Sequence, residues 1–111
     1  MSLAITSPKL DAAFLALSNG KRRGMVNTLS FQPATVTQLA NEFDLSLPAM
    51  HKHIKLLEKA DLILRKKAGR TNFVALNKQP LKQAQDYLMQ YRTEWSNGEE
   101  TLENYIASLH Q

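Results

Sequence analysis

The stretch that most constrains the fold runs from Ser46 to Leu76, where an amphipathic helix pattern passes directly into a hairpin pattern. Ser46 can cap a helix, and Pro48 falls in its first turn, where a missing amide hydrogen costs little. The apolar stripe consists of Met50, Ile54 and Leu57, and the opposite face carries Pro48, Lys52, Lys55 and Lys59. We therefore predict a helix ending near Ala60 that packs against a core on one side and is basic on the other.

A two-stranded β-hairpin is predicted immediately after this helix. Its first strand begins at Leu62 and continues into a basic run, and its second strand covers residues 71–76, with Gly69 and Arg70 in the tight turn. A hairpin that follows a recognition-type helix is called a wing. Residues 45–78 contain eight Lys or Arg against two acids, although the whole chain has a net charge of only +4. Charge concentrated in this way is typical of a nucleic-acid-binding surface.

Three shorter helices are expected before this unit. Their predicted ranges are Lys9–Leu17, Lys21–Leu29 and Val36–Phe43. Ser7 can cap the first, and Thr35 with Gln38 has the form of a capping box at the start of the third. A helix, a short turn and a second helix make up a helix-turn-helix, in which the second helix reads DNA. The cluster Lys21-Arg22-Arg23 leaves three roles open, namely a solvated face, a phosphate contact or a salt bridge between subunits.

An unbroken heptad register follows Asn77. Its positions are Leu81, Ala84, Leu88, Tyr91, Trp95, Gly98, Leu102, Tyr105 and Leu109. The register favours one helix from Leu81 to Leu109, roughly 43 Å long at 1.5 Å per residue, which exceeds what a domain of this size can cover. The excess apolar stripe indicates a second copy of the chain, packed together with the first helix around Phe14. A helix that breaks at Asn97-Gly98 and folds back on its own domain remains the alternative.

The chain length suits a single domain, because 111 residues with 43% hydrophobic content can bury one core of ordinary size. The predicted fold is mainly α, a winged helix-turn-helix of about five helices plus a two-stranded β-hairpin wing. We expect residues 1–8 to be a flexible N-terminus and residues 9–111 to form a DNA-binding domain. Its terminal helices, 9–17 and 79–110, are expected to form a dimer interface.

The residue content argues against several chemistries. There is no cysteine, so no disulfide, thiolate nucleophile or Cys-bound metal is possible. No nucleophile and base pair, glycine-rich phosphate loop or carboxylate pair stands out, so we expect neither an enzyme nor a cofactor. No apolar run approaches a membrane span and no signal peptide is recognisable, which makes a cytoplasmic protein without membrane contact the expectation.

The histidines and the aromatic residues each have two interpretations. His51 and His53 stand two residues apart on a helix and point to different faces, so they do not suit a metal site. We expect His53 to have a hydrogen-bonded packing role and His51 to lie on the side that meets DNA. The aromatic set could line a ligand site, but its helical spacing fits a dimer core better. That set consists of Tyr87, Tyr91, Trp95 and Tyr105.

Several short sequence words occur here in a familiar order. Residues 14–23 read Phe-Leu-Ala-Leu-Ser-Asn-Gly-Lys-Arg-Arg, and residues 45–57 read Leu-Ser-Leu-Pro-Ala-Met-His-Lys-His-Ile-Lys-Leu-Leu. They are similar to Phe-x-Ala-Leu-(Ala/Ser)-Asp-Pro-Thr-Arg-Arg and to Leu-Ser-Gln-Pro-Ala-Val-Ser-Arg-His-Leu-Lys-x-Leu of the ArsR family of bacterial winged-helix repressors. The later words are Ala60-Asp61-Leu62-Ile63, Gly69-Arg70 and Leu76-Asn77. The resemblance covers about residues 10–109, and its C-terminal part resembles a metal-independent branch.

The chain departs from the family pattern in three places. His51-Lys52 stands where the family has Ser-Arg, which changes the groups available for base or phosphate contacts. Asn19-Gly20 replaces Asp-Pro at the start of the second helix. The third helix has no cysteine, so the thiolate ligands of the metal-sensing members are absent.

We expect DNA contacts from the helix-turn-helix and the wing, with lysines mainly neutralising phosphates and Arg70 at the wing tip reaching an adjacent minor groove. The expected DNA-contacting residues are Thr37, Gln38, Leu47, Pro48, Ala49, His51, Lys52, Lys55, Lys66, Lys67 and Arg70. The expected dimer-interface residues are Leu10, Phe14, Leu81, Leu88, Tyr91, Trp95, Leu102, Tyr105 and Leu109.

The function that these patterns favour is sequence-specific binding of double-stranded DNA by a homodimer at a two-fold-symmetric operator. Repression by occlusion of a promoter is what the family resemblance implies. Two alternatives remain. One is a winged-helix protein-interaction module that binds no DNA, and the other is a repressor with an unidentified small-molecule inducer bound near the long C-terminal helix.

Overall fold

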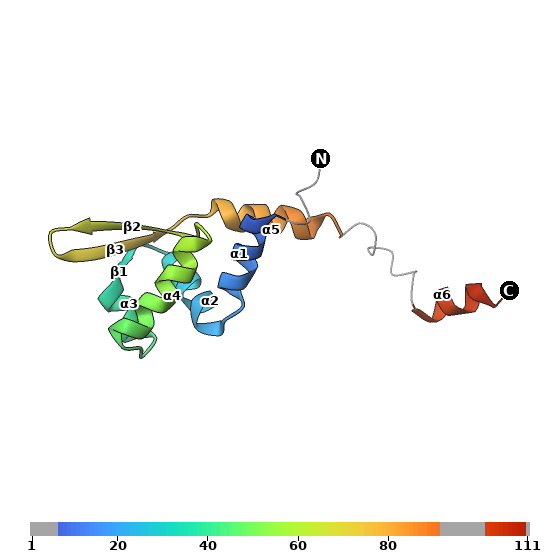
Figure 1. The fold of residues 1–111 in the computed structure, drawn as a ribbon, viewed down its shortest axis with the longest axis horizontal. Coiled ribbons are helices and arrows are strands. Elements are labelled where there is room, and N and C mark those ends of the chain that lie inside the picture. The colour runs from blue at the N-terminus through green and yellow to red at the C-terminus, as the bar shows by residue number, and fades with distance from the viewer. Residues whose placement is uncertain (1–6, 92–101, 111) are drawn as a thin grey trace.

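The computed structural model describes residues 7–91 and 102–110, which form six helices and three strands (Figure 1). The elements are α1 (Pro8–Leu17), α2 (Gly20–Leu29), β1 (Ala34–Thr35), α3 (Val36–Glu42), α4 (Leu47–Lys59), β2 (Ile63–Ala68), β3 (Thr71–Leu76), α5 (Gln79–Met89) and α6 (Leu102–Leu109). This is the predicted mainly helical, winged helix-turn-helix fold. Ser7 caps α1 and Pro8 is its first residue, so these two positions of the expected N-terminal segment belong to the helix and its cap.

The wing consists of β2 and β3, which project from one end of the helical body in Figure 1. The sheet is antiparallel with the strand order β1-β3-β2. The predicted two-stranded wing is confirmed, and a short strand that was not predicted joins it, because β1 pairs Ala34 with Val74 and Thr35 with Phe73. A strand of two residues is too short to show an alternating pattern, so its pairing depends on the tertiary fold.

The core lies between the helix-turn-helix and the base of the wing. Its largest fully buried side chains are Met25, Leu39, Met50, Ile54, Leu57, Leu62 and Val74. All three residues of the predicted stripe on α4 are among them, which confirms the inward face of that helix. Burying each such side chain contributes about 1.5–3 kcal/mol, so the stripe fixes the rotation of α4 and turns its basic face outward.

Polar caps begin four of the helices. Asn19 caps α2, which therefore starts at Gly20 rather than at the predicted Lys21. The capping box at α3 is confirmed, since Thr35 Oγ1 accepts from the Gln38 amide and Gln38 Oε1 accepts from the Thr35 amide. Ser46 Oγ accepts from the Ala49 amide at 3.2 Å and thereby fixes the start of α4.

Gly24 permits the close approach of α2 to the end of α3. A Cβ atom at this position would lie 2.6 Å from Cε1 of Phe43, so only glycine fits against that ring without movement. This contact holds the turn between α3 and α4 against the body of the domain.

The predicted single helix from Leu81 to Leu109 was wrong, because α5 ends at Met89. The amides of Gln90 and Tyr91 bond only three residues back, to Tyr87 and Leu88, as in a terminating turn. Residues 92–101, with Trp95 and Gly98, lie outside the described part of the chain. The apolar residues near the end of α5 are exposed, and a helix gains most of its stability from tertiary packing. Beyond Leu88, the register positions that the structure describes are all exposed, namely Tyr91, Leu102, Tyr105 and Leu109.

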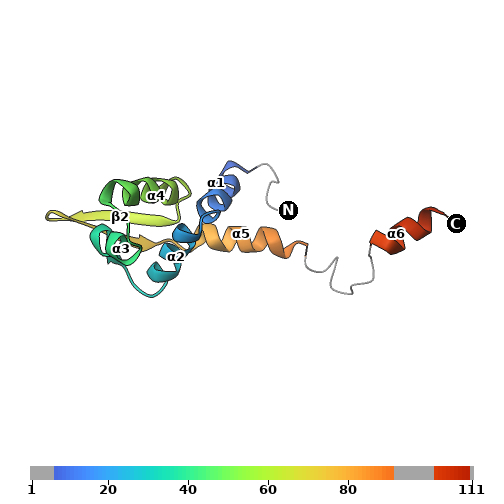
Figure 2. The same ribbon diagram turned by 90° about the horizontal axis from the view of Figure 1, so that it is seen from below.

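The two terminal helices of the body lie together at the end opposite the wing, where Figure 2 shows α1 crossing α5. The Phe14 and Tyr87 rings meet edge to face with centroids 6.1 Å apart, and Tyr87 meets Tyr91 at 5.5 Å. Every described side chain of α6 is exposed, and its apolar positions include Leu102, Tyr105 and Leu109. No helix among the described residues has the length and apolarity needed to cross a bilayer.

Candidate nucleic-acid interface

Helix α4 presents an exposed, positively charged face beside the wing. His51, Lys52 and Lys55 are exposed on it, as are Leu47 and Pro48 at its N-terminus, whereas Ala49 is half-buried. Each cation projects away from the apolar stripe that anchors the helix. The face can therefore approach a polyanion without disturbing the core.

A groove of about 490 Å³ separates α4 and α3 from the wing. Its lining residues are Thr35, Val36, Thr37, Leu47, His51, Arg70, Thr71 and Asn72. Four residues predicted to contact DNA thus lie around one hollow, although they come from α3, α4 and the tip of the wing. Asn72 and Thr71 belong to the same surface and were missed by the sequence reasoning. The signal that could have found Asn72 is its place opposite Lys67 in the hairpin.

The register of the wing puts the two predicted lysines on different faces. Lys67 pairs with Asn72 and Lys66 pairs with Phe73, and paired residues share a face of the sheet. Asn72 lines the groove, so Lys67 belongs to the face that turns toward α3 and α4. Lys66 lies on the opposite face with the exposed Phe73. The basic run in the sequence therefore divides between two surfaces.

The turn of the wing is a two-residue loop, because Ala68 pairs with Thr71 across it. Gly69 has a φ of +63°, and Arg70 at the second position has an ordinary negative φ. Gly at the first central position is the requirement of a type II′ turn, whose twist matches that of the strands. Arg70 therefore lies at the tip of the wing, as predicted.

The base of the wing is tied to α4 by a two-pronged ion pair. Arg65 donates from Nη2 to Glu58 Oε1 at 2.8 Å and from Nε to Glu58 Oε2 at 3.1 Å. Planar pairing of this kind fixes orientation as well as distance. Arg65 is thus engaged in positioning the wing relative to α4. It contributes less to the free positive charge than its place in the basic run suggested.

Gln38 already has a structural task. Its side-chain oxygen accepts the Thr35 amide at 2.9 Å as half of the capping box, which leaves only its amide nitrogen for another contact. Thr37 is exposed and lines the groove with its neighbours.

Arg22 holds α4 in place from behind, and none of the three roles left open for its cluster applies to it. Its side chain is 7% exposed. Nε donates to the Ala16 carbonyl at 2.7 Å and Nη2 to the Leu15 carbonyl at 3.2 Å. Nη1 lies 3.1 Å from Nδ1 of His53. One buried cation therefore joins the end of α1 to the middle of α4.

The other two cations of the cluster serve nearby carbonyls. Lys21 Nζ donates to the Phe43 carbonyl at 2.9 Å, and Arg23 Nη1 donates to the Leu17 carbonyl at 2.8 Å. Both side chains bond the C-terminal end of a helix, where a positive charge is favourable. A charged cluster at one helix start thus supports the ends of two other helices.

His53 has the packing role that was predicted for it. An arginine nitrogen can only donate, so Nδ1 of His53 accepts and the neutral ring carries its proton on Nε2. Burial holds the pKa of His53 below its usual range, and the Arg22 and Lys21 cations lower it further. The ring is consequently kept neutral beside the guanidinium.

The residues predicted for the dimer interface divide into two groups. Phe14 of α1, Leu88 of α5 and Tyr91 just after α5 are exposed, and the Tyr87 ring contacts those of Phe14 and Tyr91. Leu10, by contrast, is only 7% exposed and lies in the interior of its own domain. Leu81 also packs against the core of the same chain, although it is only partly buried. Trp95 lies outside the described residues.

The arrangement suits recognition rather than bond-making chemistry. Within residues 7–91 and 102–110, no three His, Asp or Glu side chains gather to hold a metal ion. The groove offers a bidentate-capable arginine, an imidazole, an amide and three threonine hydroxyls, all of which can bond to base edges or phosphates.

Comparison with known proteins gives the same picture. A family model described as a helix-turn-helix domain matches residues 17–65, from the end of α1 into the wing. The chain is similar to the HTH-type transcriptional regulator Rv2034 of Mycobacterium tuberculosis, with 39% identity over 59 residues. That alignment covers 53% of this chain and 55% of the relative. The matched part spans about half the length of the curated relatives.

Solved structures match over more of the chain. An ArsR family transcriptional regulator, RHA00566, is 34% identical with a TM-score of 0.79, over 91% of this chain and 100% of that one. HlyU from Vibrio cholerae N16961 has a TM-score of 0.65 over 82% of this chain and 97% of its own. Its identity of 21% supports similarity of fold alone. Both Rv2034 and RHA00566 are described as transcriptional regulators.

Proposed function

The chain belongs to the ArsR family of transcriptional regulators, and on that premise we propose that it is a homodimeric repressor which binds a two-fold-symmetric DNA operator. The observation that carries the proposal is the groove between α3, α4 and the wing tip. It collects His51, Arg70 and Asn72 from three elements on one exposed surface. Cations on α4 and β2 flank that surface, and opposing acids are absent from its lining.

The two parts of this surface have different tasks. Lys52, Lys55 and Lys67 neutralise phosphates, which supplies affinity and salt dependence with little choice of sequence. His51 on α4 contacts base edges in the major groove, and Leu47 contacts thymine methyl groups. Arg70 reaches the neighbouring minor groove from the wing tip.

Two copies are needed for the symmetric operator. The exposed apolar surface of α1 and α5, with Phe14, Leu88 and Tyr91, supports self-association at the end of the domain opposite the wing. The two α4 helices would then enter successive major grooves about 34 Å apart. Promoter occlusion follows from such binding, since a bound dimer excludes polymerase from the same duplex.

The test is a selection from a random duplex pool, followed by fluorescence anisotropy with the enriched duplex and a scrambled control over a salt series. We expect an inverted-repeat sequence to be enriched. Lys55→Ala should weaken both duplexes and flatten the salt dependence by about one counterion. His51→Ala should weaken mainly the enriched duplex and reduce discrimination at one position of each half-site.

The matched control is Lys9→Ala, which removes the same charge from the exposed surface of α1, away from the groove. It should leave both affinities nearly unchanged. Absence of any enriched sequence, together with equal binding of all duplexes, would contradict the proposal. A protein-interaction module whose basic face meets an acidic protein would then account for the charge.

A further inference from the structure

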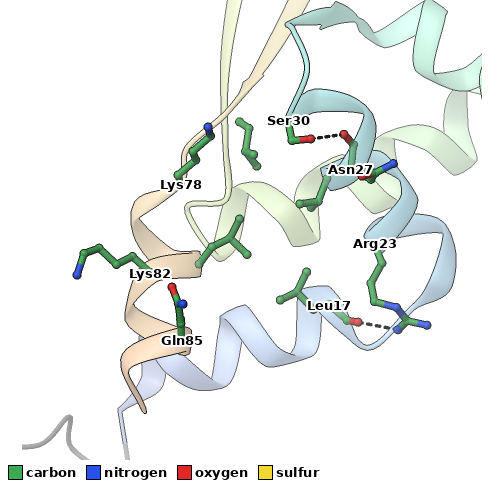
Figure 3. A pocket seen from close by; sticks show the side chains of 10 residues that line it. Leu17, Arg23, Asn27, Ser30, Lys78, Lys82 and Gln85 are labelled. Atoms are coloured by element: carbon green, nitrogen blue, oxygen red, sulfur yellow. Dashed lines mark hydrogen bonds between the residues drawn. The ribbon is translucent and has the colours of Figure 1, made fainter. Parts of the chain in front are cut away.

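A second hollow, separate from the candidate DNA surface, lies where α1, α2, the end of β3 and α5 meet (Figure 3). Its volume is about 690 Å³, within the range of small-molecule sites in proteins. None of the residues proposed to contact DNA lines it.

The walls of this cavity are aliphatic. They are formed by Leu17 of α1, Val26 of α2, Leu76 of β3 and Leu81 of α5. Each of these side chains is partly buried and packs against the main core. They therefore form the outer layer of that core, which residues 7–91 and 102–110 leave uncovered at this point. An apolar ligand group would complete the layer and be removed from water, the main source of affinity in such sites.

The rim of the cavity is polar and positively charged. Figure 3 shows Arg23 and Lys78 on opposite sides of the opening. Lys82 also lines the cavity, but it forms an exposed ion pair with Asp86 at 3.3 Å. No acidic residue is among the lining residues. Arg23 uses one of its five N–H donors for the Leu17 carbonyl, and others are available to a carboxylate.

We propose that this cavity binds an organic monocarboxylate with an apolar body, whose chain rests on the aliphatic walls and whose carboxylate meets Arg23 and Lys78. A sugar phosphate or nucleotide would suit it less, because its hydroxyls would lose water without finding partners on aliphatic walls. A neutral hydrocarbon would leave the two cations unused. Aliphatic walls together with a cationic rim favour a ligand that has both an apolar body and a negative charge.

Occupancy of the cavity has a route to the DNA surface. The residue before Arg23 is Arg22, whose guanidinium contacts His53 on α4. Leu76 ends the strand β3 of the wing, and Leu81 belongs to α5, which carries part of the proposed dimer surface. A ligand that binds one arrangement of these elements better than another shifts the population between them. This regulatory consequence rests on the proposed DNA-binding function, whereas ligand binding itself does not.

The experiment is a titration of the full chain, without DNA, with octanoate and with octan-1-ol as the neutral molecule of equal length. Amide shifts in a ¹H–¹⁵N spectrum locate the site and give the dissociation constant. We expect octanoate to move the amides of Val26, Asn27 and Leu81, and octan-1-ol to bind about tenfold more weakly. Octanoate should also change the affinity for the selected operator duplex.

Two variants test the walls and the rim separately. Arg23→Gln with Lys78→Gln should weaken octanoate about tenfold and leave octan-1-ol unaffected. The control removes the same charges from the wing, by Lys66→Gln with Arg70→Gln, and should leave octanoate binding unchanged. Gln85→Trp starts from an exposed position on the rim and should block both ligands while the thermal midpoint stays near that of the parent.

Three results would overturn the proposal. Equal binding of octanoate and octan-1-ol would show that Arg23 and Lys78 do not contribute to binding. An equal loss of octanoate affinity in the wing control would show that the effect of removing positive charge is nonspecific. Amide shifts around Gln85 that depend on protein concentration rather than on octanoate would show that a second copy of the chain covers the cavity. Failure of the unliganded protein to select any duplex would contradict the proposed function, while the octanoate titration would still decide the cavity.

Discussion

Arg22 is a buried cation that ties α4 to the end of α1. Its guanidinium donates to the carbonyls of Ala16 and Leu15 and contacts the ring of His53. Its two neighbours in the sequence carry the same charge and remain exposed. The local sequence does not distinguish Arg22 from Lys21 and Arg23, because only the packing of the helices buries one of the three.

Replacing Arg22 by Met tests this role. Met keeps an apolar stem but leaves two buried carbonyls and the His53 ring without their donor. We expect the free energy of unfolding to fall by about 1.5–3 kcal/mol in urea denaturation, the range for hydrogen bonds to a charged group. Arg23→Met removes the same charge one residue later and should cost no more than about 0.5 kcal/mol. Equal effects of the two substitutions would contradict the buried role.

His53 should make the stability of the protein sensitive to mild acid. Its pKa in the folded protein is lowered by burial and by Arg22 and Lys21, so the unfolded chain takes up the proton more readily. The contribution is complete above the unfolded pKa of about 6.5 and is lost as the pH falls toward the lower folded value. The measurement is the free energy of unfolding as a function of pH.

The corresponding variant is His53→Asn, which keeps an acceptor and does not titrate. It should flatten the fall in stability just below about pH 6.5. The control is His51→Asn, at an exposed position on the same helix, which should leave the fall in place. A slope that persists unchanged in His53→Asn would assign the acid sensitivity to other groups.

At the scale of elements, two helices end in the same way. After α3, the Leu45 amide bonds to the Ala40 carbonyl and the Asp44 amide to the Asn41 carbonyl. After α4, the Leu62 amide bonds to Leu57 and the Asp61 amide to Glu58, in the same pattern. These are the two bonds of a Schellman motif, which places its central residue in the left-handed region. Asp44 and Asp61 accordingly have φ values of 55° and 57°.

Both positions should therefore prefer glycine. We expect Asp44→Gly and Asp61→Gly each to raise the free energy of unfolding by about 0.5–1 kcal/mol, since glycine adopts this conformation without strain. Removing a negative charge from a helix C-terminus acts in the same direction. Thermal denaturation of each variant provides the measurement. The same exchange at Asp86, inside α5, should lower stability, and a gain there would show that the effect is not conformational.

The success of the sequence reasoning differs from element to element. Helix α4 could be predicted almost to the residue, because its cap, its proline and its apolar stripe are all local signals. The hairpin was equally clear from Gly69 and its flanking strands. Strand β1 and the end of α5 were not, since pairing and packing over long sequence distances determine them. In the sequence, the heptad register continues past Met89, where α5 ends.

Across the whole molecule, the described residues leave an apolar surface of α1 and α5 exposed. Phe14, Leu88 and Tyr91 are exposed there, and the Tyr87 ring contacts those of Phe14 and Tyr91. Contiguous exposed apolar surface of this kind marks an interaction site. Its location opposite the wing would leave both DNA surfaces of a dimer free (Figure 2).

The substitution Leu88→Asp tests this surface, since a charge at a residue that is 56% exposed should leave the monomer folded but prevent close apolar contact. We expect sedimentation velocity to show monomers, and the affinity for the symmetric duplex to fall at least about tenfold as the second half-site is lost. Phe31→Asp introduces the same charge at a residue that is 81% exposed, in the connection between α2 and β1. If both variants remain dimeric, the interface lies elsewhere.

Features that depend on neighbours along the chain could be predicted from the sequence, namely the caps, the stripe of α4, the hairpin turn and the concentration of positive charge. The family was also indicated by short words whose order is local information. Three features became known only from the packed structure: which cation is buried, which wing lysine shares a face with Asn72, and where α5 ends. These depend on contacts between residues far apart in the sequence, whose free energy exists only after the helices have packed. For that reason, His51 and Arg70 could be predicted separately as DNA contacts, but the groove that brings them together could not.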